Sequence, residues 1–408
     1  MCNYVLLLFI LIPVAGYLLQ RYLEGLNIRM WSDKLPEKLI GICDEKEYHR
    51  TQHYYRENLR LSVWSSTLNL TVIIIMLATG GFALVDNIAR SLSENNVVIA
   101  LIFMGIIGIA SELINLPFAW YDTFVIEKKF GFNTMTKRTF ITDHLKAWFI
   151  SLLIGIPVLA IVTWLYYRMD KGFWIYAWLL VTAFTVFINF FYSELIVPLF
   201  NKQTPLVESP LRTKIEEFAA RTGFRLKNIF IIDGSKRSTK ANAYFSGFGS
   251  KKRIVLYDTL LKEMSDEEIV AVLAHEIGHY RKKHVIRNII SSVLLTGLML
   301  FLFSRIAGNP VLASALGADI PSFHIGLITF GILYSPLSLM IGLFSNYISR
   351  KNEFDADRFV KENYDADKLA SALKILSVKN LSNMNPHPAY VFFHYSHPPL
   401  LARLEKLE

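Results

Sequence analysis

The chain has 408 residues, of which 53% are hydrophobic and 19% charged, and its mean hydropathy is +0.34. This composition excludes an ordinary soluble protein, and its long apolar runs predict membrane spans. The formal net charge of +9 could suit nucleic acid, but the basic residues gather in alternate loops, so we expect no nucleic-acid partner. The two cysteines, Cys2 and Cys43, lie in different kinds of segment, which argues against a disulfide and against a thiol active site.

Seven apolar segments are long enough to cross a bilayer. The first, residues 4–20, lacks the basic start and the cleavage site of a signal peptide, so we interpret it as a span. The loops alternate between rich and poor in Lys and Arg, which predicts an N-terminus outside or in the lumen and a C-terminus in the cytosol. We therefore expect an all-α polytopic membrane protein with a small α+β cytosolic insert. The other predicted spans are residues 62–85, 96–120, 145–167, 173–199, 285–306 and 324–348.

Two of the predicted spans carry polar residues at depth. Facing lipid, these groups would be costly, so we expect them to face protein or water. A wet cavity inside the membrane and ordinary interhelical hydrogen bonds explain them equally well. They are Glu112, Asn115, Asn189, Ser193 and Glu194.

The insert ends with an H-E-x-x-H motif at residues 275–279. Residues four apart lie on one face of a helix, so His275 and His279 can both bind a single Zn²⁺. Glu276 is close enough to take a proton from a water activated by the metal without being a ligand. Ser265 and Glu268 form a capping box, which predicts the start of this helix. A chance occurrence of the motif is the alternative.

A catalytic zinc site needs a third protein ligand. We expect a second helical segment to begin at Asn352, just after the seventh span, with Glu353 as that ligand. Asp357, one turn further on, can accept a hydrogen bond from the outer nitrogen of a ligating histidine. An exposed acidic helix start is the alternative reading.

Near the C-terminus, His397 precedes two prolines that favour an extended backbone. An imidazole held there could donate to the oxyanion of a tetrahedral intermediate. Arg403 could brace His397 or bind a substrate carboxylate. The alternative is a plain surface histidine.

Residues 241–247 and 253–257 read as the two strands of a hairpin, with residues 248–251 in its turn. The edge formed by Asn242, Ala243 and Tyr244 could pair with an extended peptide by strand addition and so bind substrate. A purely structural hairpin is the alternative, and both interpretations can hold together.

Together these motifs resemble the integral-membrane zinc proteases of the CAAX prenyl protease 1 family, along nearly the whole chain. The resemblance implies seven helices around a water-filled chamber, and one zinc ion held by His275, His279 and Glu353. It also implies catalysis by Glu276, with His397 stabilising the oxyanion. The implied reaction removes the last three residues after a prenylated cysteine, and in some members makes a second upstream cut.

The resemblance also sets expectations for the source and organisation of the protein. The chain is shorter than eukaryotic members, which favours a bacterial homologue in the cytoplasmic membrane over a protein of the endoplasmic reticulum membrane. We expect a monomer in the lipid bilayer that acts on prenylated CAAX peptides or proteins. Its expected parts are 1–199 with spans one to five, 200–283 as the protease insert, 284–348 with the last two spans, and 349–408 as a C-terminal helical segment.

Two other functions stay open. A membrane quality-control zinc protease would cut substrates without prenyl groups, although its relatives have fewer spans than the seven counted here. A metal-dependent membrane binding protein or transporter belongs to a different class, and it would have no use for a general base at Glu276.

Overall fold

The computed structural model describes residues 2–224, 226, 228–246 and 253–408. Within these residues, seven helices are long and apolar enough to cross a membrane. They are α1 (Cys2–Ile28), α2 (Glu45–Ala78), α4 (Asn96–Tyr121), α5 (Lys137–Arg168), α6 (Phe173–Phe191), α11 (His284–Ile306) and α13 (Phe323–Asn363).

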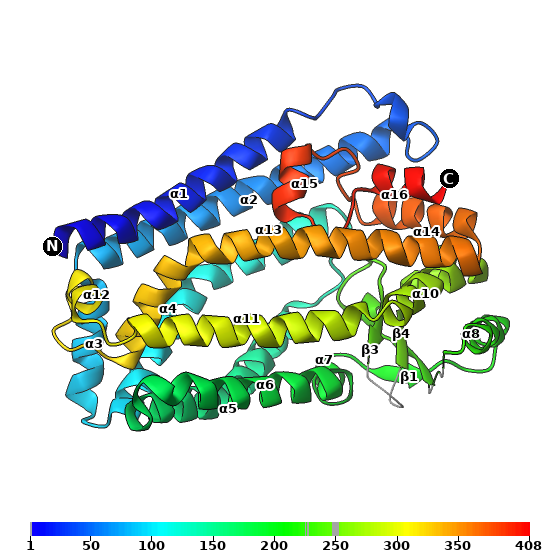
Figure 1. The fold of residues 1–408 in the computed structure, drawn as a ribbon. Coiled ribbons are helices and arrows are strands. Elements are labelled where there is room, and N and C mark those ends of the chain that lie inside the picture. The colour runs from blue at the N-terminus through cyan, green and yellow to red at the C-terminus, as the bar shows by residue number, and fades with distance from the viewer. Residues whose placement is uncertain (1, 225, 227, 247–252) are drawn as a thin grey trace.

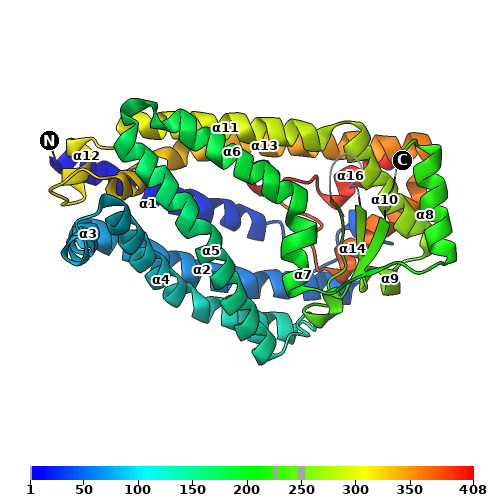
Figure 2. The same cartoon turned by 90° about the horizontal axis from the view of Figure 1, so that it is seen from below.

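These seven helices close into a ring. Helix α1 packs against α2 and α13, α2 against α4, α4 against α5, α5 against α6, α6 against α11, and α11 against α13. Figures 1 and 2, two views at right angles, show these helices lying along the length of the molecule. A recess of about 490 Å³ between α11 and α13 is lined largely by serine, threonine and asparagine. The expected architecture of helices around a chamber is therefore confirmed.

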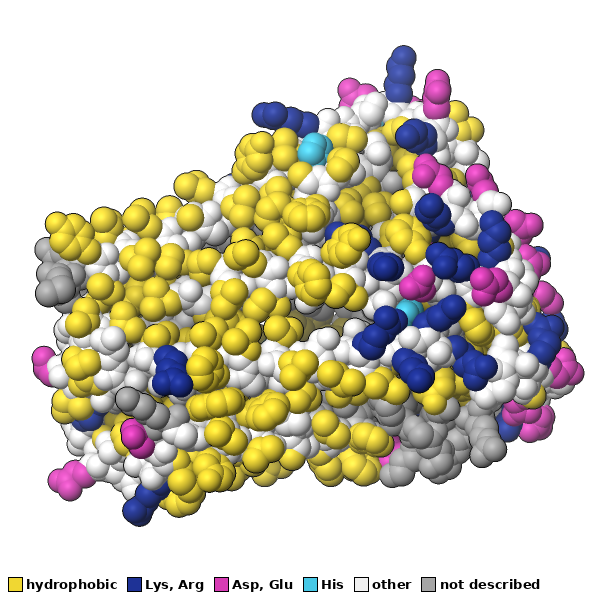
Figure 3. Space-filling view, viewed as in Figure 1, with side chains coloured by type: hydrophobic (Ala, Val, Ile, Leu, Met, Phe, Trp, Pro, Cys, Tyr) yellow, Lys and Arg dark blue, Asp and Glu magenta, His cyan; other side chains and the backbone are white. Residues whose placement is uncertain are grey.

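The surface agrees with a bilayer around the ring. In Figure 3, hydrophobic side chains cover the face along α1, α11 and α13, while charged side chains gather at the end that holds α8 (Pro210–Arg221), α10 (Asp266–Arg281) and α14 (Ala366–Lys379). Apolar side chains exposed on α11 include Ile290 and Leu294, which are 53% and 62% exposed. A continuous surface of exposed apolar side chains along the helices is stable only in contact with lipid.

The second predicted span, residues 62–85, has the wrong bounds. Helix α2 already starts at Glu45, where Asp44 and Glu47 form a capping box, and it ends at Ala78. Gly80 then takes a left-handed conformation (φ +71°), which ends the helix although the sequence stays apolar. A separate helix, α3 (Gly81–Leu92), follows.

Two spans end in π-helical turns that approach the insert. One, Asp122–Glu127, continues α4, and the other, Tyr192–Ile196, continues α6 into α7 (Val197–Phe200). Within the ring, the Asn69 amide donates to the Asn115 side chain (3.0 Å) across α2 and α4. In the second π-helical turn, Glu194 pairs with Arg253 of the insert. Asn115 therefore makes an interhelical hydrogen bond, and Glu194 makes an ion pair with a strand of the insert.

The insert contains a four-stranded sheet in the order β1-β2-β4-β3. Strands β3 (Ala243–Ser246) and β4 (Arg253–Tyr257) are antiparallel, so the predicted pair of strands is confirmed, while its turn lies outside the described residues. Strand β2 (Asn228–Ile232) is parallel to β4 and antiparallel to β1 (Gln203–Pro205). Helices α8 (Pro210–Arg221) and α10 (Asp266–Arg281) share a buried core with the sheet.

One expectation about helix starts is wrong. No new helix begins at Asn352, because α13 runs unbroken for 41 residues and carries Glu353 in its last third. A long helix is favoured there since good helix formers follow the last apolar turn without a proline or glycine. Helices α10 and α11 are separate, because Lys283 adopts φ +60° between them.

The remaining elements are short or complete the cytosolic end. The helices are α9 (Leu260–Glu263), α12 (Pro310–Ala315), α14 (Ala366–Lys379), α15 (Pro388–His394) and α16 (Leu400–Leu407), with 3₁₀ turns at Glu37–Leu39, Asp170–Gly172 and Gly234–Lys236.

Candidate active site

Helices α10 and α13 approach each other closely at Gly278. A Cβ atom added there would lie 3.1 Å from Phe359 Cβ and 3.2 Å from both the Cα and the carbonyl oxygen of Ala356. Only glycine allows this approach without a shift of backbone. The contact brings the end of the long membrane helix against the H-E-x-x-H motif. The capping box of Ser265 and Glu268 that starts α10 is present as predicted.

Three side chains converge across this contact. His275 Nε2 lies 3.1 Å from His279 Nε2; Glu353 Oε2 lies 3.3 Å from His275 Nε2, and Glu353 Oε1 lies 3.1 Å from His279 Nε2. Tetrahedral zinc with bonds of roughly 2.0–2.1 Å separates its ligand atoms by about 3.3 Å. The buried Glu353 Oε2 has no hydrogen-bond partner among the described residues. The two imidazoles and the carboxylate are therefore spaced to suit a tetrahedral metal site.

The Nδ1 atom of His275, on the far side of the ring from Glu353, is hydrogen-bonded to Asp357. His275 Nδ1 donates to Asp357 Oδ1 (2.8 Å), so Nε2 is left free to face the other ligand atoms. Arg403, from α16, donates to both oxygens of Asp357 at 2.9 and 2.6 Å. Burial lowers the pKa of His275, but the Asp357 and Glu353 carboxylates outweigh it and raise the pKa to about 9. This pocket is built to stabilise positive charge at that imidazole.

The site opens into a cavity of about 610 Å³. Glu276 lines it beside the two histidines, and so do Asn242 and Ala243 from the insert. Glu276 is half-buried, so its carboxylate can reach solvent within the cavity. A carboxylate next to a metal site but outside the converging atoms suits a general base.

One side of the cavity is formed by a strand whose outer edge has no partner strand among the described residues. Strand β3 is the last strand of the sheet, and the Asn242 carbonyl accepts from the Tyr257 amide of β4 (3.2 Å). Because bonding alternates along an antiparallel strand, the N–H and C=O of the next residue, Ala243, face away from β4. The Asn242 side chain accepts from this Ala243 N–H at 2.8 Å. Tyr244 packs its ring on Tyr257.

Asn380, at the C-terminal end of α14, fixes the start of this edge. Its side chain accepts from the Ala241 N–H (3.2 Å) and donates to the Ala241 carbonyl (3.3 Å). These two hydrogen bonds satisfy the backbone of Ala241 as a neighbouring strand would, but they involve that residue alone. Ala243 is therefore the first position where an added peptide could pair.

His397 lies at the mouth of the site. It is exposed, its Nε2 is 3.4 Å from Glu353 Oε1, and its Nδ1 is 2.9 Å from the Ser396 hydroxyl. The chain just before it is tied to α13, where Arg350 donates to the Tyr395 carbonyl at 2.6 Å. An imidazole so placed can reach an oxygen near the metal position from the cavity side.

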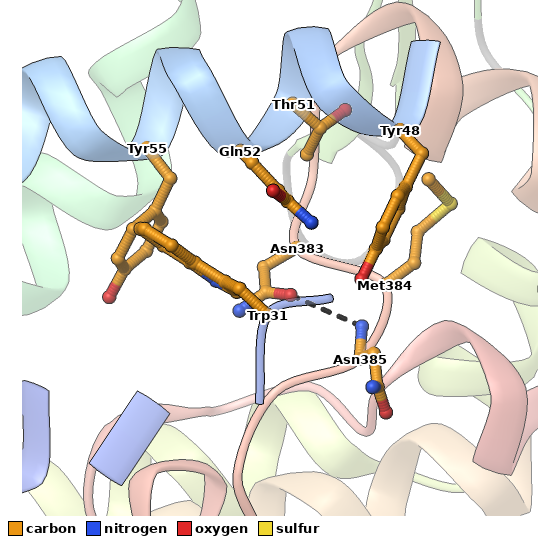
Figure 4. Close-up of a pocket in the computed structure, with 8 residues that line it drawn as sticks. All are labelled: Trp31, Tyr48, Thr51, Gln52, Tyr55, Asn383, Met384 and Asn385. Carbon is orange, nitrogen blue, oxygen red and sulfur yellow. Dashed lines mark hydrogen bonds between the residues drawn. The ribbon is translucent and has the colours of Figure 1, made fainter. Parts of the chain in front are cut away.

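The C-terminal segment is also packed against the loop between the first two spans. Figure 4 shows Trp31 of this loop beside Tyr55 of α2, with Asn383 and Asn385 of the C-terminal segment facing them. The rings of Trp31 and Tyr55 meet edge to face, with centroids 5.3 Å apart. Asn27, at the end of α1, accepts from the His387 backbone at 2.9 Å. These contacts hold the segment that carries His397.

The structure thus brings most of the predicted site residues together. The converging ligand atoms come from His275, His279 and Glu353, with Glu276, His397, Asn242 and Ala243 around the cavity and Asp357 behind. Of the two roles considered for Arg403, bracing of His397 has no contact to support it among the described residues, since the guanidinium donates to Asp357 and lies 3.5 Å from Glu353. Sequence reasoning missed His284 and Asn380. The five-residue spacing of His284 from His279 gave no signal, because the two rings face each other only across the break at Lys283.

The chain is similar to known proteins along nearly its whole length. Residues 26–202 match the family described as CAAX prenyl protease N-terminal, five membrane helices, and residues 205–408 match peptidase family M48. The chain is similar to CAAX prenyl protease 1 of Saccharomyces cerevisiae, with 34% identity over 422 residues that cover 97% of this chain and 93% of that protein. It is 36% identical to the CAAX prenyl protease 1 homolog of Oryza sativa subsp. japonica, over 97% of this chain and 95% of that protein.

The fold is shared as well. The crystal structure of S. mikatae Ste24p matches with a TM-score of 0.94 and 34% identity, over 99% of both chains. Two family profiles that together span most of the chain, full-length relatives above 30% identity and a matching fold lead to one conclusion. This protein belongs to the CAAX prenyl protease 1 family within peptidase family M48 and is a multi-pass membrane metalloprotease.

Proposed function

We propose that the protein is a zinc endopeptidase that removes the C-terminal tripeptide from prenylated CAAX substrates. The observation that carries this proposal is the tetrahedral spacing of His275, His279 and Glu353 beside an unpaired strand edge. Two imidazoles and one carboxylate with one open position form a donor set typical of catalytic zinc in peptidases. The relatives named CAAX prenyl protease 1 favour a prenylated substrate.

Each residue of the site has its own role in the proposed peptide cleavage. A bound zinc ion supplies a Lewis acid that polarises a peptide carbonyl and lowers the pKa of a water. The N–H and C=O of Ala243 pair with the substrate backbone, whose carbonyl displaces the Asn242 side chain from that N–H. Glu276 takes the proton of the attacking water and returns it to the leaving amine. His397 donates to the oxyanion, while Asp357 and Arg403 keep His275 oriented.

The experiment that tests the proposal uses purified protein and a farnesylated CAAX peptide. Mass spectrometry should find the released tripeptide, and a zinc chelator should abolish its release. Readdition of Zn²⁺ should restore it. Persistent cleavage in the chelated protein would refute the metal assignment.

An unprenylated peptide of the same sequence separates the two protease hypotheses. Preference for the farnesylated peptide supports CAAX processing, whereas equal cleavage supports quality control of membrane proteins. Metal uptake into vesicles without any hydrolysis would support a transporter instead.

The setting of the protein in the cell is also a proposal. The charge alternation of the loops favours a cytosolic metal site, and we propose a monomer. The membrane is that of the endoplasmic reticulum in a eukaryote and the cytoplasmic membrane in a bacterium. The chain covers 95% of the length of its rice homologue, so its length gives no support to the bacterial origin that we expected.

A further inference from the structure

His284 is a buried imidazole that the proposed mechanism does not use. It is the first residue of α11 and is 2% exposed. Its Nδ1 lies 3.0 Å from Nδ1 of His279, and the two ring centroids are 5.1 Å apart. The contact is thus on the side of His279 that faces away from Glu353.

The positions of the ring atoms fix which nitrogen donates. His279 Nε2 is the atom that converges with His275 Nε2 and Glu353, so it must be unprotonated to bind a metal. A neutral His279 then carries its proton on Nδ1 and donates it to Nδ1 of His284. His284 is consequently the acceptor in this bond, and its own proton lies on Nε2.

The break between α10 and α11 is what allows this contact. In an unbroken helix, a residue five positions on lies about 140° around the axis, too far to face the same side chain. Lys283 interrupts the helix with φ +60°, a conformation that lysine rarely adopts. Such strain persists where the surrounding structure or function requires it, and here it turns His284 back onto His279.

His284 also leaves a polar group unsatisfied. Its Nε2 is buried and has no hydrogen-bond partner among the described residues. An apolar side chain would avoid the cost of burying an unpaired N–H group, so packing alone does not explain a histidine at this position. The hydrogen bond to His279 does explain it.

We propose that His284 is a positioning residue for metal binding: by accepting from His279 Nδ1, it fixes the tautomer and the ring orientation that direct His279 Nε2 at the metal. It acts on His279 as Asp357 acts on His275. The use of a neutral acceptor avoids a further buried carboxylate beside Glu353 and Asp357. The inference rests on the proposed role of His279 as a ligand.

The test compares two substitutions in the full-length protein in detergent. Asn can place an oxygen near the position of Nδ1, so His284→Asn should keep the dissociation constant for Zn²⁺ within about threefold. His284→Leu removes the acceptor at similar volume, and it should weaken Zn²⁺ binding by about 10–100-fold. The visible absorption spectrum of the Co²⁺-substituted protein should change in the Leu variant and be retained in the Asn variant.

Two control variants distinguish a loss of positioning from a loss of stability and from a wrong set of metal ligands. Leu300→Ala truncates a buried side chain of the same helix away from the site, so it should lower thermal stability and leave Zn²⁺ affinity unchanged. His279→Ala should lose tight Zn²⁺ binding, and if it does not, the proposed ligand set itself fails. Parental affinity and spectrum in His284→Leu, or equal losses in the Leu and Asn variants, would overturn the positioning role alone. If the Leu variant does not fold, the Asn variant still decides, because a tenfold weaker affinity there contradicts the proposal.

Discussion

Among the described residues that line the cavity, Glu276 carries the one carboxylate besides that of Glu353, and it is not part of the group that could hold a metal. We expect Glu276→Gln to reduce peptide cleavage by at least about 100-fold, since general-base catalysis contributes roughly 10²–10⁴-fold. The amide has the same size but cannot take up a proton. Metal content, measured by atomic absorption, should stay at the parental level.

His275→Ala is the matched control for Glu276→Gln, because it should lose both metal and cleavage. Activity of the Glu276→Gln protein within tenfold of the parent would show that another group is the base.

The charge around His275 predicts how metal binding depends on pH. Without metal, Asp357 and Glu353 hold the pKa of His275 at about 9, against the effect of burial. Below that pH, a metal must displace a proton from this ring. The apparent affinity for Zn²⁺ should therefore fall about tenfold for each unit by which the pH is lowered. Titration with Zn²⁺ at several pH values between about 6 and 8 measures the slope, and an affinity independent of pH would contradict it.

At the scale of elements, the contact of α10 with α13 positions Glu353, the proposed third ligand. Gly278→Ala places a Cβ at 3.1–3.2 Å from Phe359 and from the Ala356 backbone, which cannot move as a flexible side chain would. We expect the two helices to separate by a few tenths of an ångström and Zn²⁺ affinity to fall about tenfold, on the scale reported for disturbed metal surroundings. Gly331→Ala, with open space around the added atom, is the control on α13 and should bind Zn²⁺ normally.

The free edge of β3 is the element that we propose to bind substrate. Ala243→Pro removes an N–H that faces away from β4, so the sheet keeps its ladder, as edge strands tolerate proline. One lost hydrogen bond to substrate, about 0.5–1.5 kcal/mol, should lower kcat/KM by roughly 3–10-fold.

Ala243→Val serves as its comparison, because it keeps the N–H and suits a strand. Equal kcat/KM for the Pro and Val proteins would argue against strand addition at this edge.

For the whole molecule, the two ends of the helix ring have separate roles. At the end away from the metal, the buried Asp86 of α3 accepts from His324 (2.6 Å) and from Arg90 (2.9 Å), and this joins α3 to the start of α13. Along α13, His324 and Glu353 are about 44 Å apart at 1.5 Å per residue.

Asp86→Ala should therefore destabilise the fold without changing the chemistry. Removal of one partner from a buried ion pair costs about 3–5 kcal/mol, so the thermal transition in detergent should shift down by several degrees. The turnover per correctly folded molecule should equal that of the parent. A selective loss of kcat with unchanged stability would show that the two ends are coupled.

Particular residues show how far sequence reasoning extends. The H-E-x-x-H motif and the capping box at Ser265 depend on spacing within one helix, so they could be found without coordinates. The hairpin strands followed from two strand-like runs around a turn, and the seven spans from the length of the apolar runs. The ends of α2 and α10 could not be found without coordinates, because they depend on the backbone conformations at Gly80 and Lys283. The four-part division of the chain stays a prediction.

The sequence by itself determined which segments must enter lipid and which side chains can bind a metal, since burial of apolar length and donor chemistry are properties of the residues. Only the tertiary structure decided that Glu353 reaches the histidines, through the glycine contact of α10 with α13. It alone turned His284 onto His279 and left the Ala243 edge open. These outcomes depend on distances between groups far apart in the chain, and no local pattern encodes such distances.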